Sequence, residues 1–114
     1  MTAYNPDALP AAVRSYTDGH HLRDFDLAMA GMTDATVVID DGKTYVGRTA
    51  IRAWLERSSD EWEYTEEYVS QEQTSESTWT LVNHIEGNFP GGVVDLRYQF
   101  VLAGDDLAAL TIEP

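Results

Sequence analysis

The sequence predicts an α+β fold in which helices come first and a mainly antiparallel sheet follows. Helical spacing of apolar side chains dominates residues 7 to 60, and alternating apolar and polar runs dominate from Tyr64 onward. Helices followed by strands are typical of α+β proteins. No internal repeat, linker or change of composition divides the chain, so we expect a single domain spanning residues 1–114.

The first two predicted helices each carry an apolar stripe. In the first, we expect Asp7 to be the cap and Pro10 to lie in the first turn. The second follows an Asp24 cap and is expected to stop near Thr33. The stripes are formed by Leu9, Val13, Tyr16 and His20 in the first helix, and by Phe25, Ala28, Met29 and Met32 in the second.

A third helix is predicted from a Thr49 cap to about Asp60, with Ile51, Trp54 and Leu55 on the side that faces a sheet. The stretch ATVVIDDGKTYVG before it predicts two short strands around an Asp41-Gly42 turn. Further strands are expected at about residues 64 to 73, 78 to 88, 93 to 103 and 107 to 113.

Composition restricts the classes of function. The net charge of -13 disfavours nucleic acid as a partner, because its binders present clustered Lys and Arg. The acidic residues between Glu56 and Glu76 are interpreted as a solvated surface. The absence of cysteine excludes disulfides and thiolate metal sites. No apolar run is long enough for a membrane span and no signal-peptide pattern is present, so we expect a soluble cytoplasmic protein without a membrane partner.

The stretch NHIEGNFPGGVVDLRYQF predicts a hairpin with Phe89 to Gly92 as its turn. This register pairs Asn88 with Val93 and places the apolar side chains of both strands on one face. Two polar residues lie within that face, because Asn83 falls opposite Tyr98. On the other face, His84 falls opposite Arg97, and Glu86 falls opposite Asp95.

Asn83 and Tyr98 are the first candidate site residues. Buried polar groups without partners are costly, so these side chains either bond to each other in an ordinary core or face a cavity. Tyr16 lies on the apolar stripe of the first helix, four residues before His20, and is a second phenol that can point at the same space.

The chain resembles the SnoaL-like branch of the nuclear-transport-factor-2-like (NTF2-like) superfamily, which includes ketosteroid isomerases and polyketide cyclases. The resemblance rests on TDATVVIDDG, YVGRTAIRAWL, GNFPGGVVDLRYQFVL and LAALTIEP. It implies a cone-shaped fold, with three N-terminal helices packed in the concave face of a curved sheet around a pocket. It also implies a homodimer through the outer sheet face, here carrying His84, Asp95, Arg97 and Gln99.

The resemblance further implies positions for acid–base chemistry. Tyr16 matches the tyrosine of the first helix in the steroid isomerases, and the position of their later acid falls at Tyr98. The position of their aspartate base falls at or beside Ile39, with Asp40 as the neighbouring carboxylate. The chain therefore departs from the isomerase pattern at two of three places, although Tyr16 and Tyr98 can together act as phenolic donors to an oxyanion.

Asp40 alternates away from Val37 and Ile39, so a regular strand is expected to turn it outward toward the Asp41-Gly42 turn. Only a bulge would aim it inward. A metal site is not expected, because the histidines at 20 and 21 complete no ligand triad. Trp54 is interpreted mainly as a core residue that can also form a pocket wall.

Two functions remain open on these observations. The first is an enzyme without a cofactor that moves protons on an apolar carbonyl or hydroxyl compound, in isomerisation, cyclisation or dehydration. In it Tyr16, Tyr98 and Asp40 are the catalytic candidates, and Asn83, Trp54 and His20 contact the substrate. The second is a non-catalytic ligand-binding or dimerisation module of the same fold. The direction of Asp40 discriminates between them, because a carboxylate in a cavity favours an enzyme.

Overall fold

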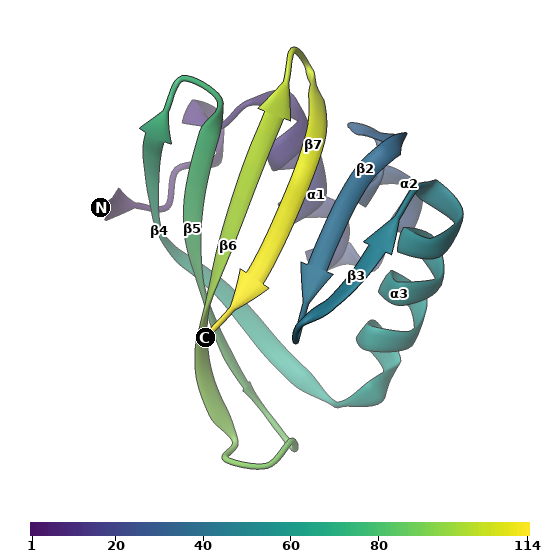
Figure 1. Cartoon of the computed structure of the whole chain (residues 1–114). Helices are drawn as coiled ribbons and strands as arrows, with labels where there is room; N and C mark the ends of the chain where they lie inside the picture. The colour runs from purple at the N-terminus through teal and green to yellow at the C-terminus, as the bar shows by residue number, and fades with distance from the viewer.

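The computed structural model describes residues 1–114 as a mixed α+β structure with a curved, open sheet of seven strands (Figure 1). The helices are α1 Ala11–Leu22, α2 Phe25–Ala28 and α3 Arg48–Glu61, and a 3-10 turn, η1, spans Pro6–Ala8. The strands are β1 Thr2–Ala3, β2 Met32–Asp40, β3 Lys43–Val46, β4 Tyr64–Ser75, β5 Thr78–Gly87, β6 Val93–Ala103 and β7 Asp106–Glu113. No helix is long and apolar enough to cross a membrane.

The strand order is β1-β4-β5-β6-β7-β2-β3, and neighbouring strands are antiparallel except β2 and β7, which are parallel. In Figure 1, α1 and α2 lie behind the sheet and α3 lies beside β2 and β3. The buried core lies between these helices and the inner face of the sheet, around Val13, Leu55, Leu81 and Phe100. The predicted α+β class is therefore confirmed.

The helix starts differ from the predicted ones. Asn5, not Asp7, caps the turn that precedes α1, through its side-chain bond to the backbone of residue 7, and Pro10 is the residue that precedes α1 rather than part of its first turn. The predicted Asp24 cap of α2 is confirmed, since its carboxylate accepts from the Leu27 amide at 3.1 Å. The helix ends at Ala28, earlier than expected, because β2 already begins at Met32.

The third helix begins after Gly47, and the predicted Thr49 cap is wrong. Gly47 occupies a positive φ of 85°, a backbone conformation that glycine adopts readily. The Asp41-Gly42 turn between β2 and β3 is confirmed, with positive φ at both residues as a type I′ hairpin turn requires.

The β5–β6 hairpin has the predicted inner and outer faces but a register that differs by two residues. Asn83 pairs with Leu96, and Leu81 pairs with Tyr98. Asn88 does not pair with Val93 but exchanges hydrogen bonds with the backbone of Glu63 at 3.0 Å, and the hairpin closes where the Gly87 amide donates to the Gly92 carbonyl at 2.9 Å. A slip of two preserves the side-chain faces because their period along a strand is two residues.

The pairs on the outer face of this hairpin are shifted by the same two residues. His84 lies opposite Asp95, not Arg97. The two side chains touch, and Nδ1 of His84 is 2.6 Å from Oδ1 of Asp95. Arg97 lies opposite Val82, and Glu86 lies opposite Val93. The four residues predicted for a dimer interface nevertheless share the outer face.

Candidate functional site

A cavity of about 240 Å³ lies between α1, α3 and the inner face of the sheet. Ten of its fourteen lining residues are hydrophobic, among them Ile85, Leu96 and Ile112. Mostly apolar walls with a few polar groups are typical of sites for small organic molecules. The volume lies somewhat below the roughly 300–1,000 Å³ that is common for drug-sized ligands.

Asp40 lines this cavity, so the expectation that it points outward is wrong. Its strand β2 pairs with β7 such that Val38 lies beside Leu110 and Asp40 beside Ile112, and the inner face holds these residues. Val37 and Ile39 face outward instead. No bulge at Asp40 is needed, because the inward set of β2 is simply the alternate set of residues.

The carboxylate of Asp40 accepts a hydrogen bond from Nε1 of Trp54 on α3 at 3.0 Å. Burial raises the pKa of Asp40 above its ordinary value, and this hydrogen bond partly opposes the rise. A raised pKa makes the carboxylate a stronger base. Asp40 is therefore a basic group that lines an apolar cavity. Trp54 itself is buried, as predicted, and stacks on Tyr45.

Tyr16 lies on α1, where it is fully buried and lines the same cavity as Asp40. Its hydroxyl has no hydrogen-bond partner within the chain. Burial raises the pKa of Tyr16, and the nearby Tyr98 and Glu66 raise it further. The phenol therefore stays protonated at physiological pH and can donate. A buried donor without a partner is uncommon, because such a group has lost water without replacement.

Tyr98 on β6 lines the same cavity, with its ring 6.3 Å from that of Tyr16. Its hydroxyl lies 3.5 Å from Nδ2 of Asn83, a diagonal neighbour on β5. Burial also raises the pKa of Tyr98. The predicted contact between Asn83 and Tyr98 therefore exists, but it is long and it comes from a diagonal relationship rather than direct pairing.

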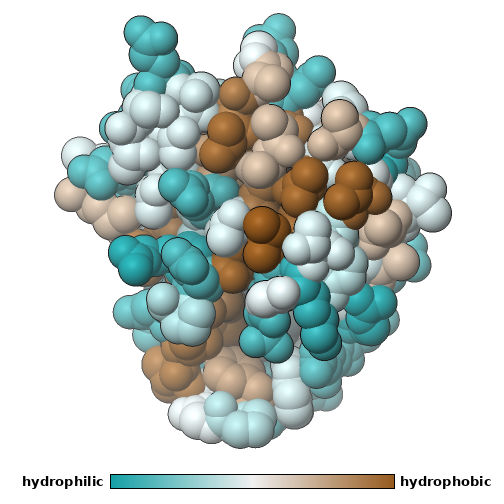
Figure 2. Space-filling view, in the orientation of Figure 1, coloured by the Kyte–Doolittle hydropathy of each residue, from teal (hydrophilic) through white to brown (hydrophobic).

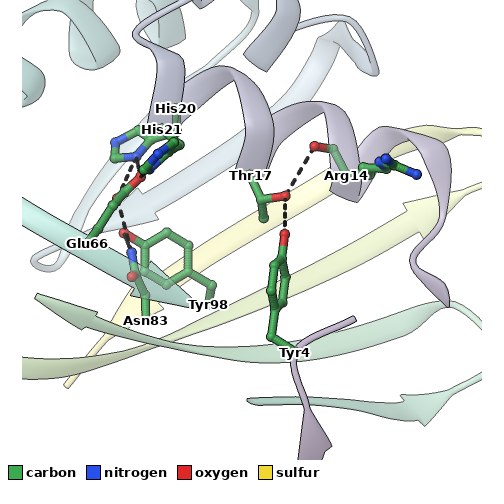
Figure 3. Close-up of polar contacts among 8 residues, drawn as sticks. All are labelled: Tyr4, Arg14, Thr17, His20, His21, Glu66, Asn83 and Tyr98. Carbon is green, nitrogen blue, oxygen red and sulfur yellow. Dashed lines mark hydrogen bonds and ion pairs between the residues drawn. The ribbon is translucent and has the colours of Figure 1, made fainter. Parts of the chain in front are cut away.

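Glu66 on β4 is the polar residue that the sequence interpretation missed. Its side chain is only 5% exposed, although it lies within the acidic stretch interpreted as a solvated surface. It accepts from Nδ2 of Asn83 at 3.2 Å and lies 2.9 Å from Nδ1 of His20 (Figure 3). The sequence did contain a signal for this burial. Glu66 lies two residues from both Tyr64 and Tyr68, and residues two apart in a strand point to the same face, so Glu66 shares the aromatic, inward side of the strand.

The structure thus brings most of the predicted site residues to one cavity. Tyr16, His20, Asp40, Trp54 and Tyr98 line it. Asn83 does not line it, but is buried behind Tyr98, with its Oδ1 lacking a partner. No group of three or more His, Asp or Glu side chains is arranged to hold a metal ion.

No protein-family model matches the sequence, and no curated protein matches it significantly. Solved structures do. A putative polyketide cyclase from Sinorhizobium meliloti is 25% identical, with a TM-score of 0.88 over 96% of this chain and 100% of that one. The Δ5-3-ketosteroid isomerase from Mycobacterium sp. is 17% identical, with a TM-score of 0.72 over 91% of this chain and 90% of that one.

A third structure is that of a Mycobacterium tuberculosis protein in complex with estradiol-17β-hemisuccinate, which is 15% identical with a TM-score of 0.73 over 90% of each chain. At 17% and 15% identity, the similarity to the ketosteroid isomerase and to the steroid-bound protein shows a shared fold and nothing more. The resemblance predicted from the sequence is confirmed at this level: the structural neighbours of this chain are polyketide cyclase-like and ketosteroid isomerase-like proteins, which are members of the NTF2-like and SnoaL-like superfamily.

Proposed function

We propose that this protein binds a small, largely apolar molecule with a carbonyl or hydroxyl group and moves a proton on it without a cofactor, as isomerases and cyclases do. The inward position of Asp40 carries the proposal. A buried carboxylate with a raised pKa in an apolar cavity is suited to act as a general base.

In the proposed reaction, Asp40 removes a proton from the carbon next to the carbonyl group. The electron pair of that C–H bond moves toward the carbonyl oxygen, which becomes an enolate oxygen. The hydroxyl of Tyr16, which has no other partner, donates a hydrogen bond to this oxygen, and Tyr98 is the second donor. Return of the proton to another carbon completes an isomerisation, and attack of the enolate carbon on a second carbonyl completes a cyclisation.

The neighbours support the chemical class of the ligand. Two of them are a putative polyketide cyclase and a ketosteroid isomerase, and a third binds a steroid ester. The cavity of about 240 Å³ favours a smaller molecule than a steroid. We therefore propose a ligand of one or two rings.

Hydrogen–deuterium exchange tests the proposal without knowledge of the natural substrate. The probe is 2-tetralone, a bicyclic ketone whose C1 protons lie next to the carbonyl group, dissolved in D2O and followed by proton NMR. The protein should accelerate exchange at C1, and Asp40→Asn should reduce the acceleration by about 100 to 10,000-fold. Asp41→Asn is the matched control, since Asp41 is exposed in the adjacent turn. Exchange by the wild-type protein at the uncatalysed rate would refute the enzyme.

A second candidate function is non-catalytic binding by the same cavity. The contact in which Nδ2 of Asn83 donates to the Tyr98 hydroxyl favours it, because a bond that holds the phenol against the core is also what an ordinary binding pocket would have, although the O–H of Tyr98 stays free to donate. 2-Naphthol, whose fluorescence reports on its protonation and surroundings, distinguishes the two functions. Binding of 2-naphthol together with uncatalysed exchange of 2-tetralone would identify a binding module.

We also propose a homodimer through the outer sheet face. The predicted polar residues His84, Asp95, Arg97 and Gln99 lie there. Beside them, an outer apolar strip crosses β6, β7, β2 and β3, and consists of Val101, Ala109, Val37, Ile39 and Val46. Hydrophobic surface gathers on the face of the sheet turned toward the viewer in Figure 2. Exposed apolar patches commonly mark protein interfaces, and a monomeric mass in light scattering at micromolar concentration would contradict the dimer.

A further inference from the structure

A buried pair formed by His20 and Glu66 lies beside the cavity and takes no part in the proton transfer described above. Nδ1 of His20 is 3.0 Å from Oε1 and 2.9 Å from Oε2 of Glu66. The two side chains are only 8% and 5% exposed. A solvated surface therefore does not explain either residue.

The contacts of Glu66 determine which nitrogen of His20 carries the proton. Nδ2 of Asn83 donates to Oε2 of Glu66 at 3.2 Å, so this oxygen acts as an acceptor toward two nitrogens. An ionised carboxylate can only accept hydrogen bonds. Toward an ionised Glu66, Nδ1 of His20 is the nitrogen that carries the proton, and in the neutral imidazole Nε2 then has the free electron pair.

Nε2 of His20 makes no hydrogen bond within the chain, and the residue lines the cavity. Its ring stacks on that of Tyr16 with 5.7 Å between the centroids, because the two residues are one helical turn apart on α1. The cavity therefore presents two adjacent groups that interact with oxygen. Two oxygens on one short carbon chain can reach both.

We propose that the His20–Glu66 pair is a second proton-transfer centre, which acts on a hydroxyl group of the substrate, and that the substrate class is a β-hydroxy carbonyl compound. This inference rests on the proposed function, since Asp40 remains the base at carbon. Glu66 is a positioning residue, because its carboxylate contacts Nδ1 and so orients the imidazole.

The reaction is an elimination of water. Asp40 takes the proton from the carbon next to the carbonyl group, and Tyr16 donates to the carbonyl oxygen. The electron pair of the broken C–H bond forms the C=C bond, and the C–O bond of the β-hydroxyl breaks. The imidazolium of His20 gives its Nε2 proton to the departing hydroxyl, which leaves as water. Exchange with solvent then removes the proton from Asp40 and restores the one on His20.

Other titratable groups also lie around His20. Tyr16 lies on the same helix, and Tyr64 on β4 has its ring 6.4 Å from that of His20. His21 approaches Glu66 from the solvent side, with Nδ1 3.9 Å from Oε1. Of these groups, Glu66 makes the shortest polar contact with the imidazole, at 2.9 Å.

The test compares two reactions in the same proteins. The first is exchange of 2-tetralone, which requires no hydroxyl to leave. The second is dehydration of 4-hydroxy-4-phenylbutan-2-one to the conjugated enone, followed by ultraviolet absorbance. His20→Asn is the main variant, because the Asn amide nitrogen replaces Nδ1 toward Glu66 while Nε2 is lost. We expect dehydration to fall by about 100-fold or more, and exchange, in which no hydroxyl group leaves, to fall by a much smaller factor.

His21→Asn is the matched control, since its side chain is 66% exposed, and both reactions should persist in it. Dehydration at the wild-type rate in His20→Asn would overturn the inference, and so would equal losses in both reactions. A wild-type protein that exchanges 2-tetralone but does not dehydrate the hydroxy ketone would overturn it as well. Failure of the wild-type protein in the exchange reaction would instead refute the proposed function, and the inference with it.

Two further measurements test the role of Glu66. Long-range 15N–1H correlation spectra of the wild-type protein should show neutral His20 protonated at Nδ1, and protonation at Nε2 would overturn the assignment. In Glu66→Gln, one of the two carboxylate oxygens that contact Nδ1 of His20 is replaced by an amide nitrogen, so the imidazole is held less firmly. Dehydration should therefore fall by about 10-fold or more while exchange of 2-tetralone changes much less, whereas a purely structural role of Glu66 would slow both reactions equally.

Discussion

The indole Nε1 of Trp54 donates a hydrogen bond to the carboxylate of Asp40 over 3.0 Å, across the wall between α3 and the end of β2. Asp40 is thereby fixed at the edge of an apolar cavity. Burial raises the pKa of Asp40, and the hydrogen bond from the indole lowers it. These two opposing effects are the largest influences on the strength of this carboxylate as a base.

Trp54→Phe should raise the pKa of Asp40 further, because the hydrogen bond that stabilises the charged form is lost. The acidic limb of the 2-tetralone exchange profile should then move to higher pH. Trp79→Phe is the control, since Trp79 lies on β5 and does not line the cavity. An unchanged profile in Trp54→Phe would show that the indole does not tune the base.

Asp40→Asn should stabilise the protein at neutral pH relative to wild type while it abolishes exchange. The folded-state pKa of Asp40 is raised above its ordinary 3.8. Its contribution to stability is therefore present below that value and is lost as the pH rises through the folded-state pKa. Thermal melting should show similar midpoints for both proteins in acid and a higher midpoint for the variant near neutrality. The reverse order at neutral pH would contradict the raised pKa.

Tyr16→Phe should lower the exchange rate by about 100 to 1,000-fold, because an oxyanion donor is lost. The free energy of unfolding should stay the same or rise, since the hydroxyl is buried without a partner. Tyr4→Phe provides the opposite pattern: its hydroxyl is 3.0 Å from Oγ1 of Thr17, so the variant should lose about 0.5–1.5 kcal/mol and keep its activity. Urea denaturation measures both.

Asn88→Ala should destabilise the protein by about 0.5–1.5 kcal/mol, because the Asn88 side chain accepts from the Glu63 amide at 3.0 Å. Gln73→Ala is an exposed control in the β4–β5 hairpin and should change stability by less than about 0.5 kcal/mol. Urea denaturation compares the two variants. Equal stabilities would show that Asn88 does not anchor the β5–β6 turn to the start of β4.

Val37→Glu should dissociate the proposed dimer, since Val37 lies in the middle of the outer apolar strip and a buried, unpaired charge is costly. Val69→Glu is the control, because Val69 is an exposed valine that lies outside the outer apolar strip, at a bulge of β4. Light scattering should give a monomeric mass for the first variant and the wild-type mass for the second. A dimeric Val37→Glu would place the interface elsewhere.

The amino-acid sequence was enough to predict the α+β class, the strands of the main sheet and the inward face of the β5–β6 hairpin. Periodic apolar patterns carry this information, because side chains alternate between faces in strands and recur every three or four residues in helices. The same patterns indicated Tyr16, Tyr98 and Asn83 as inward residues. Their contacts depend on diagonal neighbours, which alternation does not specify.

The inward direction of Asp40 and the burial of Glu66 could be seen only in the folded protein. Val37, Val38 and Ile39 are all apolar, so alternation could not tell which set of β2 faces inward until pairing with β7 placed Asp40 beside Ile112. Glu66 lies in an acidic stretch whose other members are mostly exposed. Its burial depends on His20 and Asn83, which come from other elements and meet it only when α1 packs on the sheet.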